Sequence, residues 1–269
     1  MQSETILNGA VNPGANNALA INRYQAFGIH LLGSVLIALA SAALVFFLWY
    51  PAPLAEATGV TNIYLLLLAV DVVIGPFITL IVFNPAKKEL KRDLLIVLLL
   101  QIAALLYGLH TVFITRPVYA VYNASRFDLV YANDLTDEKL AKVTHPLFKS
   151  PPLWGSETIA VRWPADEKLR TEILMNAITG KGDDLPLIPQ YYVPYADEKA
   201  VVIKQIKPME SLRQLNTDRT QEIDALSQRY TDKKAGIGYL PLIAKLKDLT
   251  VIVAIDSAEV LEINTLKPR

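Results

Sequence analysis

The chain has 269 residues, of which 52% are hydrophobic and 19% charged, and it carries no formal net charge at pH 7. This composition is too apolar for an ordinary soluble protein, and the balanced charge argues against a nucleic-acid partner. The absence of cysteine excludes disulfides, thiol catalysis and thiolate metal sites.

Three apolar segments in the N-terminal half are long enough to cross a bilayer. A hydrocarbon core of roughly 30 Å needs about 20 apolar residues at about 1.5 Å each. The segments of this length are 28–49, 63–83 and 94–114. The first runs into Trp49 without a small-residue cleavage pattern, so we expect a retained helix and not a signal peptide. The sequence predicts a three-helix transmembrane domain over residues 23–116.

Basic residues in the second loop predict the orientation. This loop contains Lys87, Lys88, Lys91 and Arg92. The first loop, residues 50–62, contains no Lys or Arg. Because short basic loops stay in the cytoplasm, we expect the second loop and a flexible tail, residues 1–22, on the cytoplasmic side of a bacterial inner membrane. The chain after the third segment is then periplasmic. A merely solvated turn, or a lipid or partner contact, is the alternative for the basic cluster.

Asp71 lies near the middle of the second segment, where an unpaired carboxylate is costly. We expect it to face protein. Ser41 and Tyr107 are at nearly the same depth, and a hydrogen bond from either is the simplest explanation. Alternatively, Asp71 receives a polar or charged group from a partner's transmembrane helix, or carries a proton. A transport pathway has little support, because the hydrophobic centres contain no second acid or base.

Two further patterns suggest specialised helix packing. Gly75 and Pro76 follow Asp71 by one turn, and Pro76 cannot donate to the Val72 carbonyl, so we expect a kink that leaves this carbonyl free beside Asp71. Small residues recur every four positions on the first segment at Ser34, Ala38 and Ala42. Such a ridge permits close helix contact, either within the protein or with a partner.

After residue 117 the pattern changes to a period of two, which predicts strands. We expect two hairpins, 118–122 with 127–131 and 250–255 with 259–263. We expect helices over 134–143, 166–179 and 211–231. The segment 185–195, rich in Pro and Tyr, is predicted to be irregular, and either packs on the sheet or presents a recognition surface. The fold class is therefore three transmembrane helices followed by a periplasmic α+β domain, residues 117–269, with antiparallel hairpins.

The sequence lacks the common catalytic motifs. It has no Walker motif, no His-Glu-x-x-His zinc helix and no Gly-x-Ser-x-Gly elbow. Its one histidine after the third segment is His145. We therefore predict no catalytic residue, metal or cofactor, although folding could still assemble a Ser-Lys dyad or an acid pair.

Several motifs resemble the TfpX/TfpZ-type accessory proteins of type IV pilins. In the membrane half they are YQAFGIHLL (24–32), FFLWYP (46–51), DVVIGP (71–76) and LLYGL (105–109). RPVY (116–119), RF (126–127) and AND (132–134) continue the likeness beyond it. The resemblance implies an inner-membrane, non-enzymatic partner of a matched major pilin that supports pilus assembly or dynamics. Other inner-membrane pilus-assembly proteins are further candidate partners.

With a pilin as client, the intramembrane features become candidate partner-binding residues: Asp71, Gly75, Pro76, Ser34, Ala38, Ala42 and Tyr107. An alternative is a membrane-bound enzyme that modifies the pilin, such as a glycosyl- or acyltransferase. A third hypothesis is a periplasmic sensor that signals through the helices, but the cytoplasmic side offers only a tail and a short loop.

Overall fold

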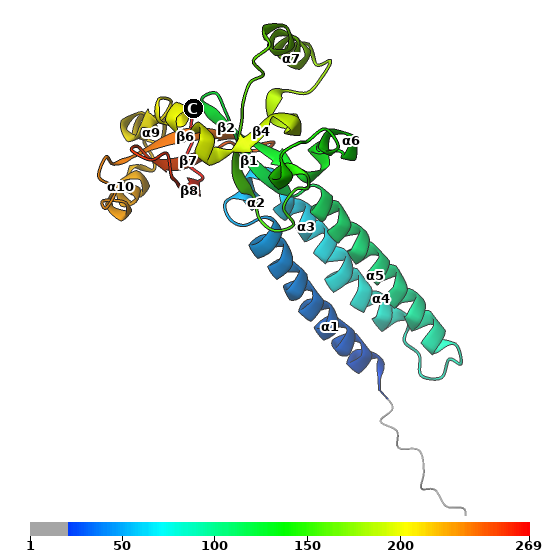
Figure 1. Cartoon of the computed structure of the whole chain (residues 1–269). Helices are drawn as coiled ribbons and strands as arrows, with labels where there is room; N and C mark the ends of the chain where they lie inside the picture. Colours follow the sequence, from blue (N-terminus) through cyan, green and yellow to red (C-terminus); the bar gives the residue numbers. More distant parts are fainter. Residues whose placement is uncertain (1–20) are drawn as a thin grey trace, which may run out of the picture.

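The computed structural model describes residues 21–269, so nearly all of the predicted tail, residues 1–22, lies outside the described residues. Three apolar helices form a bundle, and a mixed α/β domain lies at one end of it (Figure 1). The helices long and apolar enough to cross a membrane are Arg23–Trp49, Val60–Val82 and Leu90–Ile114. We call them the first, second and third spans, and the chain from Pro117 onward the sheet domain.

Each span begins a few residues before its apolar stretch. The first consists of α1 (Arg23–Ala43) and the π-helical turn η1 (Leu44–Trp49). Its start is fixed by a capping box, in which Asn22 and Gln25 each accept a hydrogen bond from the other's backbone N–H. Hydropathy does not detect this polar first turn, which explains the later start predicted from the sequence.

The second span lies between the other two. It consists of α3 (Val60–Leu68), the π-helical η2 (Ala69–Ile74) and α4 (Gly75–Val82), and the third span is α5 (Leu90–Ile114). The first span packs mainly against α4 and η2, while α5 packs against α3 and α4. The second span therefore supplies the central wall of the bundle.

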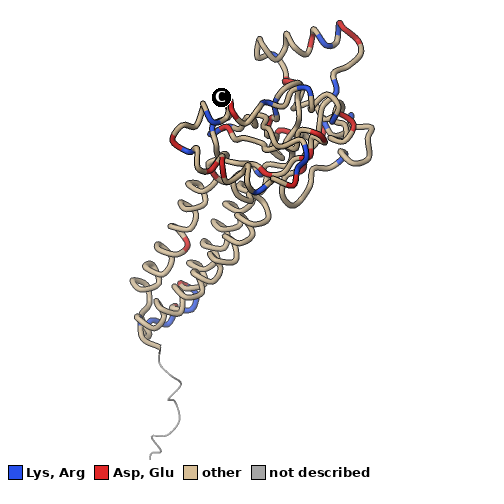
Figure 2. The backbone as a smooth tube through the Cα atoms, turned by 90° about the vertical axis from the view of Figure 1, so that its left-hand side faces the viewer, with Lys and Arg blue, Asp and Glu red and all other residues tan. Residues whose placement is uncertain are grey.

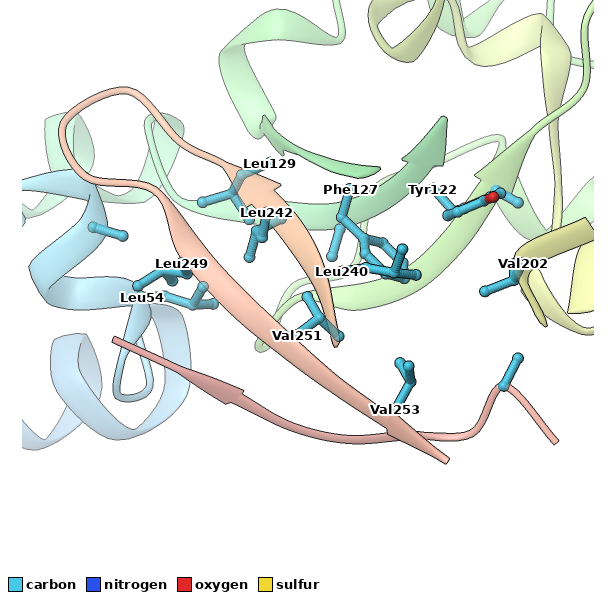
Figure 3. Packing of buried hydrophobic residues seen from close by; sticks show 14 of the residues in the cluster. Leu54, Tyr122, Phe127, Leu129, Val202, Leu240, Leu242, Leu249, Val251 and Val253 are labelled. Atoms are coloured by element: carbon cyan, nitrogen blue, oxygen red, sulfur yellow. The ribbon is translucent and has the colours of Figure 1, made fainter. Parts of the chain in front are cut away.

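The first loop contains a short helix that belongs to the core of the sheet domain. This helix, α2 (Leu54–Thr58), buries Leu54 and Ala57 among side chains of the sheet. Figure 3 shows Leu54 beside Leu249, close to the strands that carry Leu242 and Val251. The loop therefore joins the membrane bundle to the sheet domain as one packed structure.

The sheet domain is built on one open sheet in the order β4-β3-β1-β2-β6-β7-β8, with β5 paired to β6. The strands are β1 (Pro117–Asn123), β2 (Arg126–Tyr131), β3 (Glu157–Val161), β4 (Tyr192–Pro194), β5 (Lys207–Pro208), β6 (Ile237–Ile243), β7 (Leu249–Ala254) and β8 (Val260–Asn264). Both predicted hairpins are confirmed, as β1–β2 and β7–β8. The pairs β1–β3 and β2–β6 are parallel, which the sequence analysis did not anticipate.

Short helices surround the sheet. They are α6 (Asp137–Leu140), α7 (Glu167–Thr179), α8 (Lys199–Ile203), α9 (Met209–Leu215) and α10 (Thr220–Arg229). The prediction for α7 is confirmed in detail: the Asp166 carboxylate caps its start, and Gly180 ends it in a left-handed conformation at φ +67°. Figure 1 shows α7 projecting from the face of the domain that is remote from the bundle.

Three predicted elements need correction. The helix expected over 134–143 is limited to the single turn α6, which follows a 3₁₀ turn, η3 (Ala132–Asp134). The single helix expected over 211–231 is broken at Asn216, whose side-chain amide donates to Leu212 O and Lys267 O. The bond to Lys267 ties the break to the C-terminal segment. The segment 185–195 contains two 3₁₀ turns, η5 (Leu185–Leu187) and η6 (Pro189–Tyr191), and then strand β4, which pairs with β3. The segment therefore ends in a strand that is hydrogen-bonded to β3 in the sheet.

The sheet has an apolar core on each face. One contains Tyr122, Phe127 and Leu240 together with α2 and α8, and the other contains Tyr119, Val121 and residues of α7 and η5. Alternation along β1 sends neighbouring side chains to opposite cores. Burial on both faces explains why β1 and β7 are almost wholly apolar.

Candidate partner-binding site in the membrane

A cavity of about 150 Å³ lies between α1 and α5 and has the second span as its floor. Ser34 and Ala38 of α1, Asp71 of η2 and Gln101 of α5 are among the residues that line it. Ile37 and Ile102 at its rim are 52% and 43% exposed. The cavity therefore opens sideways, toward the hydrocarbon region in which the helices are embedded.

Asp71 forms the polar floor of this cavity. It lies at the centre of the second span, and its side chain is buried, with a residue exposure of 8%. Neither carboxylate oxygen has a hydrogen-bond partner. A buried polar group without a partner costs free energy, and a carboxylate in hydrocarbon costs more than a neutral group. Two acceptor atoms beside the cavity are therefore left without a donor from the described residues of this chain.

The donors proposed from the sequence do not reach Asp71. The Ser41 hydroxyl lies 2.6 Å from the Tyr64 hydroxyl and donates to Ala38 O at 3.1 Å. Tyr107 is 75% exposed on α5 and does not line the cavity. The expectation of an internal hydrogen bond to Asp71 from Ser41 or Tyr107 is therefore wrong. Depth alone suggested the pairing, whereas the rotation of each helix decides which way its side chains point.

A π-helical segment, η2, lies where the sequence predicts a kink. Gly75 N donates to Val70 O, five residues back, so the next bond in this register would join Pro76 N to Asp71 O. Proline has no N–H to donate. The Gln101 side-chain amide supplies the missing donor to Asp71 O at 3.3 Å. The carbonyl that Pro76 leaves without a donor is therefore that of Asp71, and not that of Val72 as an α-helical register predicts, and Gln101 of α5 donates to it.

Gly75 makes room for this bond. A Cβ at Gly75 would lie 1.7 Å from Gln101 Nε2, so only glycine permits the amide to approach. The other amide atom, Gln101 Oε1, is buried without a donor. Three unpaired oxygens, two from Asp71 and one from Gln101, therefore lie at or beside the cavity.

His30 is a cavity residue that sequence reasoning missed as part of the site. Its Nδ1 lies 2.6 Å from Thr79 Oγ1, which links α1 to α4 beside Ser34. His30 and Thr79 both lie toward the end of the bundle remote from the sheet domain. Their similar depth in the sequence of each span is the feature from which this contact could have been predicted. Their hydrogen bond fixes the position of α1 along one side of the cavity.

The remaining predicted residues lie elsewhere. Ala42 packs into an apolar cluster at the end of the bundle nearest the sheet domain, with Val45 and Tyr64. Gly75 and Pro76 are buried below the cavity and shape it indirectly. The ridge of small residues therefore divides, with Ser34 and Ala38 facing the cavity and Ala42 serving internal packing.

The basic loop lies at the opposite end of the helices from the sheet domain (Figure 2). Lys87 pairs with Asp93, and Arg92 pairs with Glu89. Lys88 and Lys91 are exposed. The basic residues thus lie in the loop between the second and third spans, and the orientation of this loop stays a prediction.

A second cavity, of about 270 Å³, lies in the sheet domain and gathers three acids. Asp128 bonds to Arg126 at 3.0 Å, Asp184 lies 3.9 Å from the same guanidinium, and Asp134 lies 3.6 Å from Lys245 Nζ. Burial raises the pKa of the Asp128 carboxyl above its ordinary value, although Arg126 opposes the shift. Each acid has a cationic partner, which is typical of structural ion pairs.

Among residues 21–269, no group of three or more His, Asp or Glu side chains is placed to hold a metal ion. The fold and site together define a membrane protein with three apolar helices, a lateral cavity with an unpaired acid, and a mixed α/β domain on one end.

Comparison with known proteins places the chain in a family. Residues 19–59 match the family described as Fimbrial assembly protein FimB. The fimbrial assembly protein of serogroup E1 from Dichelobacter nodosus is 30% identical over 246 residues, which cover 86% of this chain and 95% of the relative. The serogroup I protein is 29% identical with the same coverage. The protein of serogroups C1 and C2 is 33% identical over 115 residues, 42% of this chain and 88% of the relative.

The chain belongs to the family of fimbrial assembly proteins. No solved structure matches it. The predicted link to pilus assembly is thereby confirmed at the level of the family, and the narrower TfpX/TfpZ assignment stays a prediction.

Proposed function

We propose that the protein is a non-enzymatic inner-membrane accessory protein that binds the transmembrane helix of a matched major pilin and so supports type IV pilus assembly. The observation that carries the proposal is Asp71, an intramembrane carboxylate with no internal partner at the floor of a laterally open cavity. Unsatisfied intramembrane acids mark functional sites, because their cost is retained only where something uses them.

The shape of the cavity supports a helix that lies across its mouth and inserts one side chain. A helix is about 10–12 Å wide with its side chains, so it cannot enter a cavity of about 150 Å³. Gly33, Ser34 and Ala38 on one wall have small side chains, which let a second backbone approach α1 closely. A donor on the incoming helix then reaches Asp71.

The orientation in this proposal has the N-terminus in the cytoplasm and the sheet domain in the periplasm. Its support is the basic loop at the end of the bundle remote from the sheet domain. In this arrangement a pilin helix in the same bilayer meets the cavity from the side, and the pilin's periplasmic part lies level with the sheet domain.

Co-purification of pilin from membranes tests the role of Asp71. A hydrogen bond to a charged group contributes about 1.5–3 kcal/mol, and about 1.4 kcal/mol corresponds to tenfold in affinity. Asp71→Asn should therefore reduce pilin capture by roughly tenfold or more. Asp218→Asn is the matched control, because Asp218 is an exposed loop acid of the sheet domain. Undiminished capture by Asp71→Asn sinks a role for this carboxylate in pilin binding.

The alternative proposal, a membrane-bound glycosyl- or acyltransferase acting on the pilin, rests on the acid cluster around Asp128. The ion pairs of these acids favour a structural role for the cluster. Intact-mass measurement of pilin from cells with and without this protein separates the two proposals, since a transferase leaves a mass difference on its substrate. Equal masses are the result that the non-enzymatic proposal requires.

A further inference from the structure

Two loops of the sheet domain are hydrogen-bonded to the ends of the membrane bundle. The first, residues 149–155, follows the 3₁₀ turn η4 (Pro146–Phe148), and its Gly155 N–H donates to Leu48 O at 2.6 Å. The Arg116 guanidinium bridges the same loop to the third span, since it donates to Pro152 O at 2.9 Å and to Phe113 O at 2.8 Å. Leu48 and Phe113 are each one residue from the end of their spans, so this loop lies at the level where both helices leave the membrane.

The second loop, residues 244–248, connects β6 to β7. Its Leu246 and Lys247 N–H groups both donate to Ala57 O at 3.2 Å, and Lys247 pairs with Glu56. Ala57 lies in α2, just before the second span begins at Val60. This loop is therefore also fixed at the edge of the membrane-spanning region.

Both loops expose large apolar side chains at this level. Leu153 and Trp154 are each 58% exposed, and Leu246 is 67% exposed. Lys149, with an exposed side chain, accompanies Leu153 and Trp154 in the first loop. Tryptophan and lysine next to apolar residues are typical of the boundary between headgroups and acyl chains, where a ring or a long stem is apolar and its polar end is hydrated.

We propose that these two loops, 149–155 and 244–248, are interfacial membrane anchors that insert Leu153, Trp154 and Leu246 into the headgroup region of the bilayer. The occupant of this surface is phospholipid. Main-chain hydrogen bonds join each loop to the end of a span or to α2, and this continuity places the exposed side chains where the bilayer surface must lie. The sheet domain then rests on the membrane in one fixed orientation.

Apolar exposure elsewhere in the sheet domain makes a useful contrast. Ile178 is 77% exposed and belongs to α7, and Figure 1 shows this helix on the side of the domain remote from the bundle. Leu99, by contrast, is an exposed residue of the third span and should face acyl chains. Ile178 therefore serves as the reference position for water, and Leu99 as the reference position for acyl chains.

Spin labels at single cysteines test the proposal directly, because the natural chain contains no cysteine. Trp154→Cys, Leu246→Cys, Leu99→Cys and Ile178→Cys are labelled in the full-length protein in phospholipid nanodiscs. The measurement is the accessibility of each label to oxygen and to a water-soluble nickel chelate. Labels at 154 and 246 should favour oxygen, with values between those at 99 and 178. A label at either position that matches the one at 178 overturns the proposal for that loop.

Fluorescence of the natural Trp154 provides a second readout that leaves both loops unchanged. Replacing Trp49 and Trp163 with Phe leaves Trp154 as the one tryptophan of the chain. Lipids brominated near the headgroup should quench its emission more strongly than lipids brominated at the chain ends. Absence of quenching by either lipid contradicts insertion. Neither experiment uses pilin, so its result is independent of the proposed function.

Discussion

At the residue scale, the contact between Gly75 and Gln101 determines the shape of the membrane site. The Gln101 amide occupies the space that a side chain at Gly75 would fill and donates to the Asp71 carbonyl that Pro76 leaves without a partner. One glycine, one proline and one glutamine thus allow a π-helical turn at the centre of a bilayer. This turn positions the Asp71 carboxylate at the cavity.

Gly75→Ala should destabilise the protein by about 1–3 kcal/mol, because the new methyl group displaces Gln101 and leaves the Asp71 carbonyl unpaired. Gly28→Ala is the matched control, since no atom lies within 4 Å of a Cβ at that helical glycine. The control should be neutral or slightly stabilising, because Ala favours helices. Thermal unfolding in detergent measures both variants, and equal shifts would contradict this account of Gly75.

At the element scale, α2 is the part of the first loop that joins membrane bundle and sheet. Leu54→Ala should destabilise the sheet domain by about 2–5 kcal/mol, the range for truncating a leucine in a packed core. Ile178→Ala on α7 is the control and should change stability by about 0.5 kcal/mol or less. Limited proteolysis of the sheet domain reports the difference. Equal protease resistance in the two variants would show that α2 does not contribute to this core.

Local sequence patterns predicted which residues form each element, but they did not predict which elements pack against one another. Hydropathy located all three spans, and alternation located both hairpins, because each signal lies within one short segment. The parallel pairs β1–β3 and β2–β6 were missed because they join strands distant in sequence, for which a local pattern carries no signal. The burial of α2 in the sheet was missed for the same reason.

The candidate site could be predicted only in part. An acidic residue in the middle of a membrane span costs free energy, and this made Asp71 recognisable in the sequence. The small residues Ser34 and Ala38 line the cavity together with it. The lack of any internal partner for Asp71 could not be predicted, because it depends on the rotation of three helices. That rotation turns Ser41 toward Tyr64 and leaves Tyr107 on the outer surface of α5.

At the scale of the whole molecule, the separation of the basic loop from the sheet domain predicts the topology. A membrane-impermeant maleimide should label Ile178→Cys in cells whose outer membrane alone is permeabilised. It should label Lys88→Cys only after the inner membrane is opened, because the basic loop is expected in the cytoplasm. The opposite pattern of labelling would place the sheet domain in the cytoplasm and overturn the proposed orientation.

Under the proposed function, two surfaces of the protein are placed to contact pilin. The lateral cavity faces the bilayer, and the sheet domain lies directly beyond the ends of the helices (Figure 1). Because α2 packs into the sheet core, a helix that docks at the cavity meets a domain held in a fixed position. We infer that pilin contacts both surfaces when it is bound.

Photocrosslinking in living cells tests the central claim most directly. A photoreactive amino acid at Ile37 or Ile102, on opposite sides of the cavity, should form a covalent adduct with pilin. The same amino acid at Ile81, an exposed position of the second span outside the cavity, should not. Adducts confined to positions 37 and 102 are the predicted result. No adduct at these positions, or equal adducts at 81, would contradict binding of the pilin helix at the Asp71 cavity.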